Sequence, residues 1–422
     1  MTSLTLLFWI AAAIALQVAV YLGIGFLRHW RDYQALRDEA KDLNLPVGPH
    51  TAVESNAPPS PAGWPGFRTF VVEHKVIEDA AQSVCSFYLK PEDGQALPAF
   101  APGQFLTFRL EVPGADGSSG QLLRCYSLSD APRPDGYRVS IKRALPPADS
   151  NFPQGRSSSF FHDHVAVGSR LQVRAPSGHF HIDHGEVPVV LIGGGIGITP
   201  MLSMLNWVVA EQPGREVWLF YGVRHSRELV MRAHLEALSA AHPNFHLHFC
   251  ISNPLPEDVN GRDYHHRGRI DVPLLRMQLP LKPFHYYICG PAPLMESLVP
   301  ALEEWGVPDA HIHFEAFGPA SVKRKQPAVQ PVSTAINSDI VVTFTKSGKQ
   351  LHWQPGDGSL LEFAESNGIS VDSGCRAGGC GSCQTSIRAG EISYRQEPEF
   401  DPEPGSCLLC VSIPKTSITL EA

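Results

Sequence analysis

Three cysteines near the C-terminus stand at a spacing that binds metal. Cys375, Cys380 and Cys383 follow the pattern Cys-x4-Cys-x2-Cys in a glycine-rich segment, and Cys407 and Cys410 further on are both candidates for a fourth ligand. Soft thiolates at this spacing favour an iron–sulfur cluster of the [2Fe-2S] type over a hard cation. A zinc site would favour paired Cys-x2-Cys units instead. The segment is therefore predicted to bind a redox cluster.

A second pattern with chemical meaning is a glycine-rich turn directly after the apolar run 187–192. The turn and the residues after it contain Gly193, Gly194, Gly195, Gly197, Thr199 and Pro200. Glycines let a backbone approach a pyrophosphate closely, and proline fits the first turn of a following helix. Further β/α units at 216–223, 227–240 and 246–252 predict a doubly wound sheet. Cys289 and Gly290 end a last predicted strand, where open α/β sheets bind ligands.

A third pattern lies upstream, where Arg124, Tyr126 and Ser127 share one predicted strand. An arginine for a phosphate and an aromatic side chain for a ring suit a flavin. Lys142 follows on a later strand, and Gly155, Ser157 and Ser158 open a predicted helix whose N-terminal amides favour a pyrophosphate. The short strands predicted at 67–76, 83–89, 105–110, 137–142 and 171–174 are rich in β-branched and aromatic residues. They indicate an antiparallel barrel.

The amino terminus predicts a membrane anchor. No residue from Leu4 to Leu27 is charged, and a helix of this length covers about 36 Å, more than the roughly 30 Å of a bilayer core. Arg28 and Arg31 follow it, so the positive-inside rule places the catalytic domains on the cytoplasmic side. A cleaved signal peptide would need a positive n-region and a clear cleavage site. We therefore expect a single-pass protein of the cytoplasmic membrane, with residues 4–27 in the lipid bilayer.

Composition excludes several other classes of protein. The chain has 422 residues and a formal charge of -8, so it is long enough for several domains and lacks the basic surface that nucleic acid requires. Its 9 cysteines include the tight C-terminal group, a poor layout for a disulfide framework and one that favours a reducing compartment. None of the 19 histidines has zincin spacing, so no histidine is assigned to catalysis.

The order of these motifs resembles the ferredoxin-NADP reductase superfamily over residues 67–422. The succession of flavin, nicotinamide and C-terminal plant-type ferredoxin domains is similar to reductases of the phthalate dioxygenase and vanillate demethylase type, which lack the N-terminal anchor. The expected fold is multidomain, with a transmembrane helix, an antiparallel β-barrel, an α/β doubly wound domain and an α+β β-grasp ferredoxin domain. The predicted boundaries are an anchor at 1–30, a juxtamembrane helix and linker at 31–66, a flavin domain at 67–184, an NAD(P)H domain at 185–318, a linker at 319–338 and a ferredoxin domain at 339–422.

The resemblance also implies roles for individual residues. The flavin is expected on Arg124, Tyr126 and Ser127, with Ser158 at its pyrophosphate, and Cys410 is expected as the fourth cluster ligand because residues 409–414 resemble the terminal ligand segment of the family. The nicotinamide is expected near Thr199 and Pro200 on one side and near Cys289 and Gly290 on the other, with Glu315 and Phe317 closing over the flavin. The residues expected to be catalytic are Cys289, Thr199, Ser127 and Glu315. The other cofactor-binding positions are Lys142, Gly155, Ser157, Gly193, Gly194, Gly195 and Gly197.

The predicted function is a membrane-anchored reductase that moves electrons from NAD(P)H to flavin, then to [2Fe-2S], and on to an acceptor protein. FAD is favoured over FMN, and NADH over NADPH because Ser252 is followed by Asn253 rather than arginine, although Arg224, Arg227 and Arg262 are nearby cations. A membrane oxygenase, hydroxylase or fatty-acid desaturase is the expected acceptor. The alternatives are a soluble hybrid-cluster or haem protein as acceptor, and a non-catalytic relay or assembly subunit.

Overall fold

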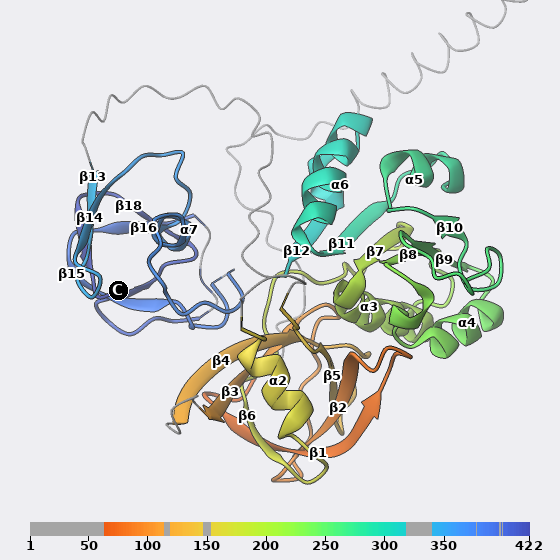
Figure 1. Ribbon diagram of the computed structural model, residues 1–422, viewed down its shortest axis with the longest axis horizontal. Coiled ribbons are helices and arrows are strands. Elements are labelled where there is room, and N and C mark those ends of the chain that lie inside the picture. Colours follow the sequence, from red (N-terminus) through yellow and green to blue (C-terminus); the bar gives the residue numbers. More distant parts are fainter. Residues whose placement is uncertain are drawn as a thin grey trace, which may run out of the picture. The chain divides into compact units, whose positions relative to one another are not determined.

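The computed structural model describes residues 63–422 apart from 114–118, 147–152, 318–339, 377, 396–397 and 399. All of these residues belong to one compact unit, Pro59–Ala422. They build an antiparallel six-stranded sheet, a parallel six-stranded sheet and a mixed five-stranded sheet with a separate two-stranded ribbon (Figure 1).

The first sheet closes on itself as a barrel. Its strands are β1 (Arg68–Ile77), β2 (Val84–Pro91), β3 (Phe105–Pro113), β4 (Ser119–Ser127), β5 (Tyr137–Lys142) and β6 (Arg170–Val173), in the order β4-β3-β6-β1-β2-β5. A bridge between Leu128 and Val139 joins the end of β4 to β5, so the two edges meet. Helix α2 (Arg156–Asp163) inserts Phe161 into the interior, with ring centroids 5.2 Å from Phe87 and 5.3 Å from Phe108. The predicted barrel is present.

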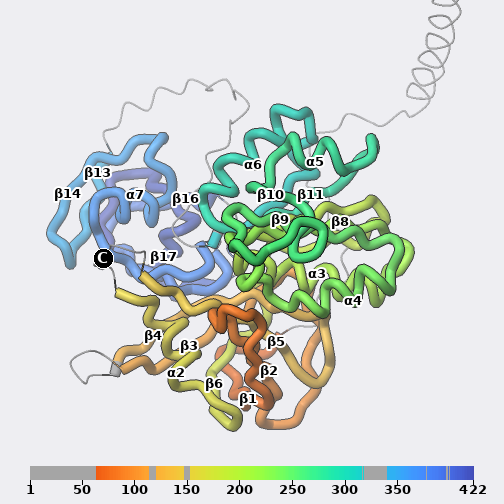
Figure 2. Tube along the Cα trace, turned by 45° about the vertical axis from the view of Figure 1, so that its right-hand side comes forward, coloured from red at the N-terminus to blue at the C-terminus, as the bar shows by residue number. Residues whose placement is uncertain are grey.

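The second sheet is parallel and covered on both faces. Its strands are β7 (Val189–Gly194), β8 (Val217–Val223), β9 (Phe245–Ile251), β10 (His266–Arg267), β11 (His285–Gly290) and β12 (Ile312–Ala316), in the order β10-β9-β8-β7-β11-β12. Helices α3 (Ile198–Glu211) and α4 (Arg232–Ala241) cover one face, and α5 (Val272–Gln278) and α6 (Ala292–Trp305) cover the other (Figure 2). Strands β8 to β10 extend the sheet on one side of β7, and β11 and β12 extend it on the other side. The strand order therefore reverses at the β7/β11 border, which is the switch point of the sheet.

Strand β12 is a difference from the sequence-based prediction, in which the strand ending at Cys289 and Gly290 was the last of this sheet. β12 pairs in parallel with β11 and forms the edge of the sheet. It was missed because an edge strand needs no continuous apolar run, and β12 carries His313 and Glu315 among its five residues.

The third sheet resembles the expected β-grasp arrangement. Its elements are β13 (Ile340–Phe344), β14 (Lys349–Trp353), α7 (Leu360–Ser366), β15 (Gln384–Ala389), β16 (Ile392–Tyr394), β17 (Ser406–Leu408), β18 (Ser412–Pro414) and β19 (Ile418–Leu420). β19 lies between β13, to which it is parallel, and β15, to which it is antiparallel. A capping box between Ser359 and Glu362 begins α7. Leu360, Leu361 and Phe363 then pack into the core of this domain.

The transmembrane part of the predicted fold class is corrected. Across the part of the chain that the structure describes, no helix has the length and apolar character needed to cross a bilayer. The segment 4–27, for which the anchor was predicted, lies outside the described residues. An uncharged run is a property of sequence alone, and no helix among the described residues supports a membrane span. The predicted membrane localisation is corrected in the same way, because no helix among the described residues supports it.

Candidate functional site

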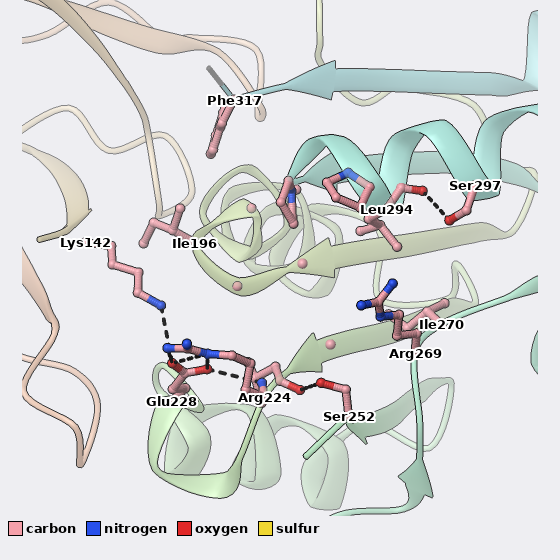
Figure 3. Close-up of a pocket in the computed structure, with 18 of the residues that line it drawn as sticks. Lys142, Ile196, Arg224, Glu228, Ser252, Arg269, Ile270, Leu294, Ser297 and Phe317 are labelled. Atoms are coloured by element: carbon pink, nitrogen blue, oxygen red, sulfur yellow. Dashed lines mark hydrogen bonds and ion pairs between the residues drawn. The ribbon is translucent and has the colours of Figure 1, made fainter. Parts of the chain in front are cut away.

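A cavity of about 490 Å³ lies at the carboxyl ends of the parallel strands (Figure 3). Its walls include the turn Gly194–Gly197 after β7, Gly222–Arg224 at the end of β8, Ser252 after β9, Gly290 and Pro291 after β11, and Ser297 of α6. This is the crevice where open α/β sheets bind dinucleotides. The predicted phosphate-binding turn therefore faces a cavity of suitable size.

The turn needs glycine at Gly197 because another strand passes very close to it. A Cβ atom on Gly197 would stand 2.2 Å from the carbonyl oxygen of Cys289 and 2.7 Å from the amide nitrogen of Gly290. These are backbone atoms of β11, which cannot move aside cheaply. The close approach brings the start of α3 against the end of β11 and so shapes the floor of the cavity.

A second cavity of about 390 Å³ adjoins the first. The barrel contributes Arg124, Tyr126, Ser127 and Lys142 to its walls, the parallel domain contributes Ile196, Thr199, Glu315 and Phe317, and the cysteine loop contributes residues 373–376. Lys142, Ile196 and Phe317 line both cavities. A ligand in one cavity can therefore reach a ligand in the other.

The start of α2 lies beside this second cavity. The hydroxyl groups of Tyr126 and Ser157 share a hydrogen bond of 2.7 Å, and burial raises the pKa of Tyr126 to about 12. Ser158 Oγ donates to the carbonyl of Gly155 at 3.1 Å. Ser159 Oγ is buried and has no hydrogen-bond partner among the described residues. Because no side chain caps α2, its first turn has the donors that a flavin phosphate requires.

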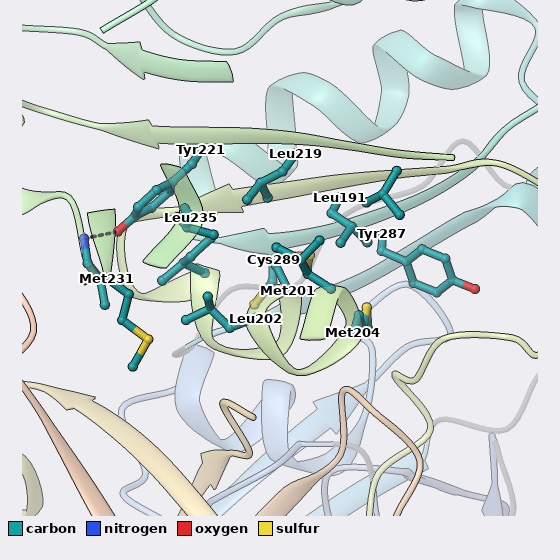
Figure 4. Close-up of a cluster of buried hydrophobic side chains, with 14 of the residues drawn as sticks. Leu191, Met201, Leu202, Met204, Leu219, Tyr221, Met231, Leu235, Tyr287 and Cys289 are labelled. Atoms are coloured by element: carbon teal, nitrogen blue, oxygen red, sulfur yellow. Dashed lines mark hydrogen bonds between the residues drawn. The ribbon is translucent and has the colours of Figure 1, made fainter. Parts of the chain in front are cut away.

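The four residues predicted to be catalytic do not all face the cavity. Ser127, Thr199 and Glu315 line it, whereas Cys289 is fully buried beneath it and lines neither cavity. Figure 4 shows Cys289 in the core of the parallel domain, together with Leu191, Met201 and Leu219. Gly193 and Pro200 also lie behind the cavity walls.

Glu315 is a half-buried acid, and one of its carboxylate oxygens is buried and unpaired among the described residues. It pairs in register with Cys289 across β11 and β12, and its Oε2 has no hydrogen-bond partner among the described residues. Burial raises the pKa of Glu315 to about 8. An unpaired acid that faces a cavity is the kind of group that a bound ligand satisfies.

We expect Glu315→Gln to flatten the pH dependence of thermal stability. The pKa of Glu315 rises from an ordinary 4.5 to about 8 on folding. The stability that this group contributes is therefore present below about pH 4 and is lost as the pH rises through about 8. Tm measured from pH 5 to pH 9 should fall more steeply for the wild-type protein than for the glutamine variant. If the curves of Tm against pH were parallel for the two proteins, Glu315 would not be protonated in the folded protein at neutral pH.

The cluster cysteines approach one another in two pairs. Cys383 Sγ lies 3.1 Å from Cys410 Sγ, and Cys380 Sγ accepts a hydrogen bond from the backbone amide of Cys375 at 3.2 Å and lies close enough to the Cys375 thiol for the two to interact. Within the described ranges, no three His, Cys, Asp or Glu side chains are placed to hold a single metal ion. Two thiolate pairs fit a two-iron cluster, in which four cysteines serve two irons. Cys407 is fully buried in β17, in the core of this domain.

The cysteine loop also contacts the barrel. Arg174 Nη1 donates to the carbonyl of Cys380 at 2.9 Å, and its guanidinium group lies 4.7 Å from the ring centroid of Phe67 and 4.6 Å from that of Phe400. The thiol of Cys125, which stands between Arg124 and Tyr126, lies near that of Cys380, and burial together with this neighbour raises the pKa of Cys125. These contacts hold the loop at the wall of the second cavity.

Several of these residues were not found from the sequence. Ile196 lies inside the glycine turn and could have been inferred from it. Arg174, Glu228 and Arg269 have no local signal, because their positions at the cavities or the cysteine loop depend on strands far apart in the chain.

Comparisons with known proteins agree with this geometry. The family model for the oxidoreductase NAD-binding domain matches residues 191–299, and that for the 2Fe-2S iron-sulfur cluster binding domain matches residues 342–415. Flavohemoproteins of Halalkalibacterium halodurans and Bordetella pertussis are 38% and 36% identical over 62% and 66% of this chain. These matches span 62% and 67% of the relatives' own lengths.

Two solved structures are similar to the chain. The FAD/NAD-binding domain of nitric oxide dioxygenase from Vibrio cholerae is 33% identical, with a TM-score of 0.53, over 60% of this chain and 100% of that domain. Phthalate dioxygenase reductase, described as a modular structure for electron transfer from pyridine nucleotides to [2Fe-2S], is 28% identical with a TM-score of 0.50. That match covers 85% of this chain and 98% of the reductase.

The fold and the two adjoining cavities thus define an NAD(P)H-dependent oxidoreductase. The chain belongs to the ferredoxin-NADP reductase-like family of FAD- and NAD-binding oxidoreductases, extended by a C-terminal [2Fe-2S] domain. Its cofactors are FAD, NAD(P)H and a [2Fe-2S] cluster. The predictions of enzyme class and cofactors are confirmed.

Proposed function

We propose that this reductase delivers single electrons to a separate acceptor protein, the oxygenase or hydroxylase component of a multicomponent oxygenase. When bound, FAD supplies hydride acceptance and the cluster supplies one-electron transfer. The observation that carries the proposal is that residues 373–376 of the cysteine loop line the same cavity as Tyr126 and Ser127. A flavin held there lies beside the cluster loop. The similarity to phthalate dioxygenase reductase, which extends over nearly all of that protein, supports an oxygenase as acceptor.

The residues at the border of the two cavities would position the bound cofactors and keep water away from them. Lys142, Ile196 and Phe317 form the passage between the two cavities, where a nicotinamide ring would meet the flavin ring. Phe317 is half-buried there and would exclude water from the reacting atoms. Thr199 Oγ1 donates to the carbonyl of Ile196 at 3.0 Å, which holds the turn that carries Ile196.

A haem protein is the second candidate acceptor. The observation that favours it is the 38% identity to a flavohemoprotein over 62% of this chain. The chain matches only 62% of the length of that first relative. The terminal acceptor of those relatives is therefore carried over only as a proposal.

Anaerobic titration of the purified holoprotein with NADH and with NADPH tests the electron path. Flavin bleaching followed by a rhombic reduced [2Fe-2S] EPR signal is the expected result. Stopped-flow reduction of a purified iron–sulfur oxygenase component and of a haem protein, cytochrome c, then compares the two acceptors. A cluster that stays oxidised while the flavin bleaches would overturn the proposed order.

We expect Arg269→Gln to raise the KM for both nicotinamide nucleotides by roughly fivefold, because a single exposed arginine–phosphate contact is of modest strength. Arg269 lines the 490 Å³ cavity, and no salt bridge or side-chain hydrogen bond links it to another described residue. Its charge is therefore available to a pyrophosphate. Steady-state ferricyanide reduction with each nucleotide measures the effect, and an unchanged KM would remove Arg269 from the binding site.

A further inference from the structure

A charged side chain of the barrel reaches the cysteine loop of the third domain. Arg174 directly follows β6, and its backbone nitrogen donates to the carbonyl of Thr107 at 2.9 Å, so the residue is fixed to the barrel. Its Nη1 donates to the carbonyl of Cys380, a predicted cluster ligand, at 2.9 Å. Arg174 is half-buried, and no carboxylate among the described residues pairs with it. An arginine keeps its charge in such a place, so the cluster loop has a cation beside it.

Two aromatic rings contact the same guanidinium group, one from each domain. The ring centroid of Phe67, the residue before β1, lies 4.7 Å from it, and that of Phe400, in the third domain, lies 4.6 Å from it. A planar guanidinium group stacks on aromatic rings in a way that the ammonium group of lysine does not. Arg174 therefore joins the barrel to the third domain by two ring contacts and one hydrogen bond.

Phe400 is itself fixed to the cysteine loop. Its backbone nitrogen donates to the carbonyl of Gly378, between the cluster cysteines, at 3.1 Å. A Cβ atom on Gly381 would stand 2.7 Å from Cζ of Phe400, and Gly381 has a φ of 72°. Glycine at this position lets the ring lie directly on the loop. A contact that holds Phe400 therefore holds the loop as well.

We propose that Arg174 is a positioning residue for electron transfer from the flavin to the cluster: it fixes the cysteine loop against the barrel, and its charge stabilises the reduced cluster. The inference rests on the proposed function, because it takes residues 373–376 to lie beside a flavin in the 390 Å³ cavity. Electron transfer slows steeply as two centres separate, so the loop must stay at this wall. One electron leaves the reduced flavin and enters the cluster, which keeps its ligands and gains one negative charge. A nearby cation favours that form.

Redox potentiometry with dithionite and mediators, followed by EPR, tests the charge in the full-length holoprotein without turnover. Arg174→Gln should lower the equilibrium constant for one-electron reduction of the cluster by about tenfold, a fall of about 59 mV in its midpoint potential. Arg174→Lys keeps the charge and should retain a midpoint potential near that of the wild-type protein. A wild-type potential in a folded, cluster-loaded Arg174→Gln protein would overturn the proposed effect of the charge, and so would an equal fall in both variants.

Stopped-flow reduction by NADH tests the positioning, because flavin bleaching and cluster reduction are followed separately. Arg174→Gln, Arg174→Lys and Phe400→Leu should each slow cluster reduction while flavin bleaching keeps its wild-type rate, since all three lose ring contacts. Phe400→Leu should leave the midpoint potential unchanged, because Arg174 is still present. Wild-type rates of cluster reduction in these variants would overturn the positioning role.

Arg170→Gln is the matched control. Arg170 also belongs to β6, but its side chain is 73% exposed and pairs with Glu92 at 2.6 Å, so its loss should change neither the potential nor the rate. Tm and iron content show whether each variant is folded and carries its cluster. A wild-type cluster that dithionite reduces and NADH does not would count against the proposed electron path, and the potentials of the variants would still decide the role of the Arg174 charge.

Discussion

Cys410→Ser should abolish the [2Fe-2S] absorbance and EPR signals of the purified protein, whereas Cys407→Ser should keep both. The two cysteines are close in sequence and differ in their surroundings. Cys410 Sγ lies 3.1 Å from Cys383 Sγ. Cys407 is fully buried among the apolar side chains of the domain core, and no sulfur–sulfur contact joins it to another cysteine of the described residues.

The same pair of variants separates the flavin from the cluster. The cluster depends on four cysteine ligands, and we expect it not to assemble without the Cys410 thiolate, so Cys410→Ser should lose NADH-driven reduction of cytochrome c. Ferricyanide reduction should survive because the wall residues of the flavin cavity are untouched. Iron content, visible absorbance and low-temperature EPR measure the outcome. A serine variant at Cys410 that retained its cluster while the Cys407 variant lost it would exchange the two assignments.

Gly197→Ala should nearly eliminate reduction of the flavin by NADH. The added Cβ would stand 2.2 Å from the carbonyl oxygen and 2.5 Å from the carbonyl carbon of Cys289. No real Cβ atom lies so close to another backbone, so α3 or β11 must shift, and both shape the nucleotide cavity. Overpacking of this kind costs about 1–3 kcal/mol, and a displacement of about 1 Å at a reacting centre costs on the order of a hundredfold in rate.

Gly214→Ala is the matched control for this substitution. Gly214 lies in the turn between α3 and β8, and a Cβ there would meet nothing within 4 Å. Stopped-flow flavin bleaching at saturating NADH and the Tm of both variants give the comparison. Equal rates for the two alanine variants would show that the close approach at Gly197 has no functional role.

Local patterns were sufficient for much of the fold. β5 has the predicted bounds 137–142, and β3 begins at the predicted Phe105. The helix predicted over 227–240 differs at its start, because residues 226–228 form a 3₁₀ turn and α4 begins only at Arg232. A contact with the barrel, made by the residue just before α4, prevents the helix from starting earlier. Met231 N donates to the carbonyl of Glu78 at 3.0 Å and adopts a left-handed conformation with φ of 51°.

The candidate site was predicted only in part, because tertiary contacts also decide which side chains face the cavities. Arg124, Tyr126, Ser127 and Thr199 line the 390 Å³ cavity that we propose for the flavin, but Cys289 lies in the core beneath it. The orientation of a side chain at the end of a strand depends on what packs on each face, and a Cys-Gly-Pro motif carries no information about that. The roles of these residues stay predictions until variants are measured.

The sequence by itself determined the chemistry that is local along the chain. The cysteine spacing, the glycine turn and the alternation of strands and helices each lie within a few tens of residues, so they are legible without a fold. Only the tertiary structure decided how these parts share a site. It brought Lys142 of the barrel to Glu228, set Cys383 opposite Cys410, and left Glu315 Oε2 buried with no hydrogen-bond partner among the described residues. Those relations depend on packing between segments that are distant in sequence. Burial and charge then change the properties of the side chains that this packing brings together.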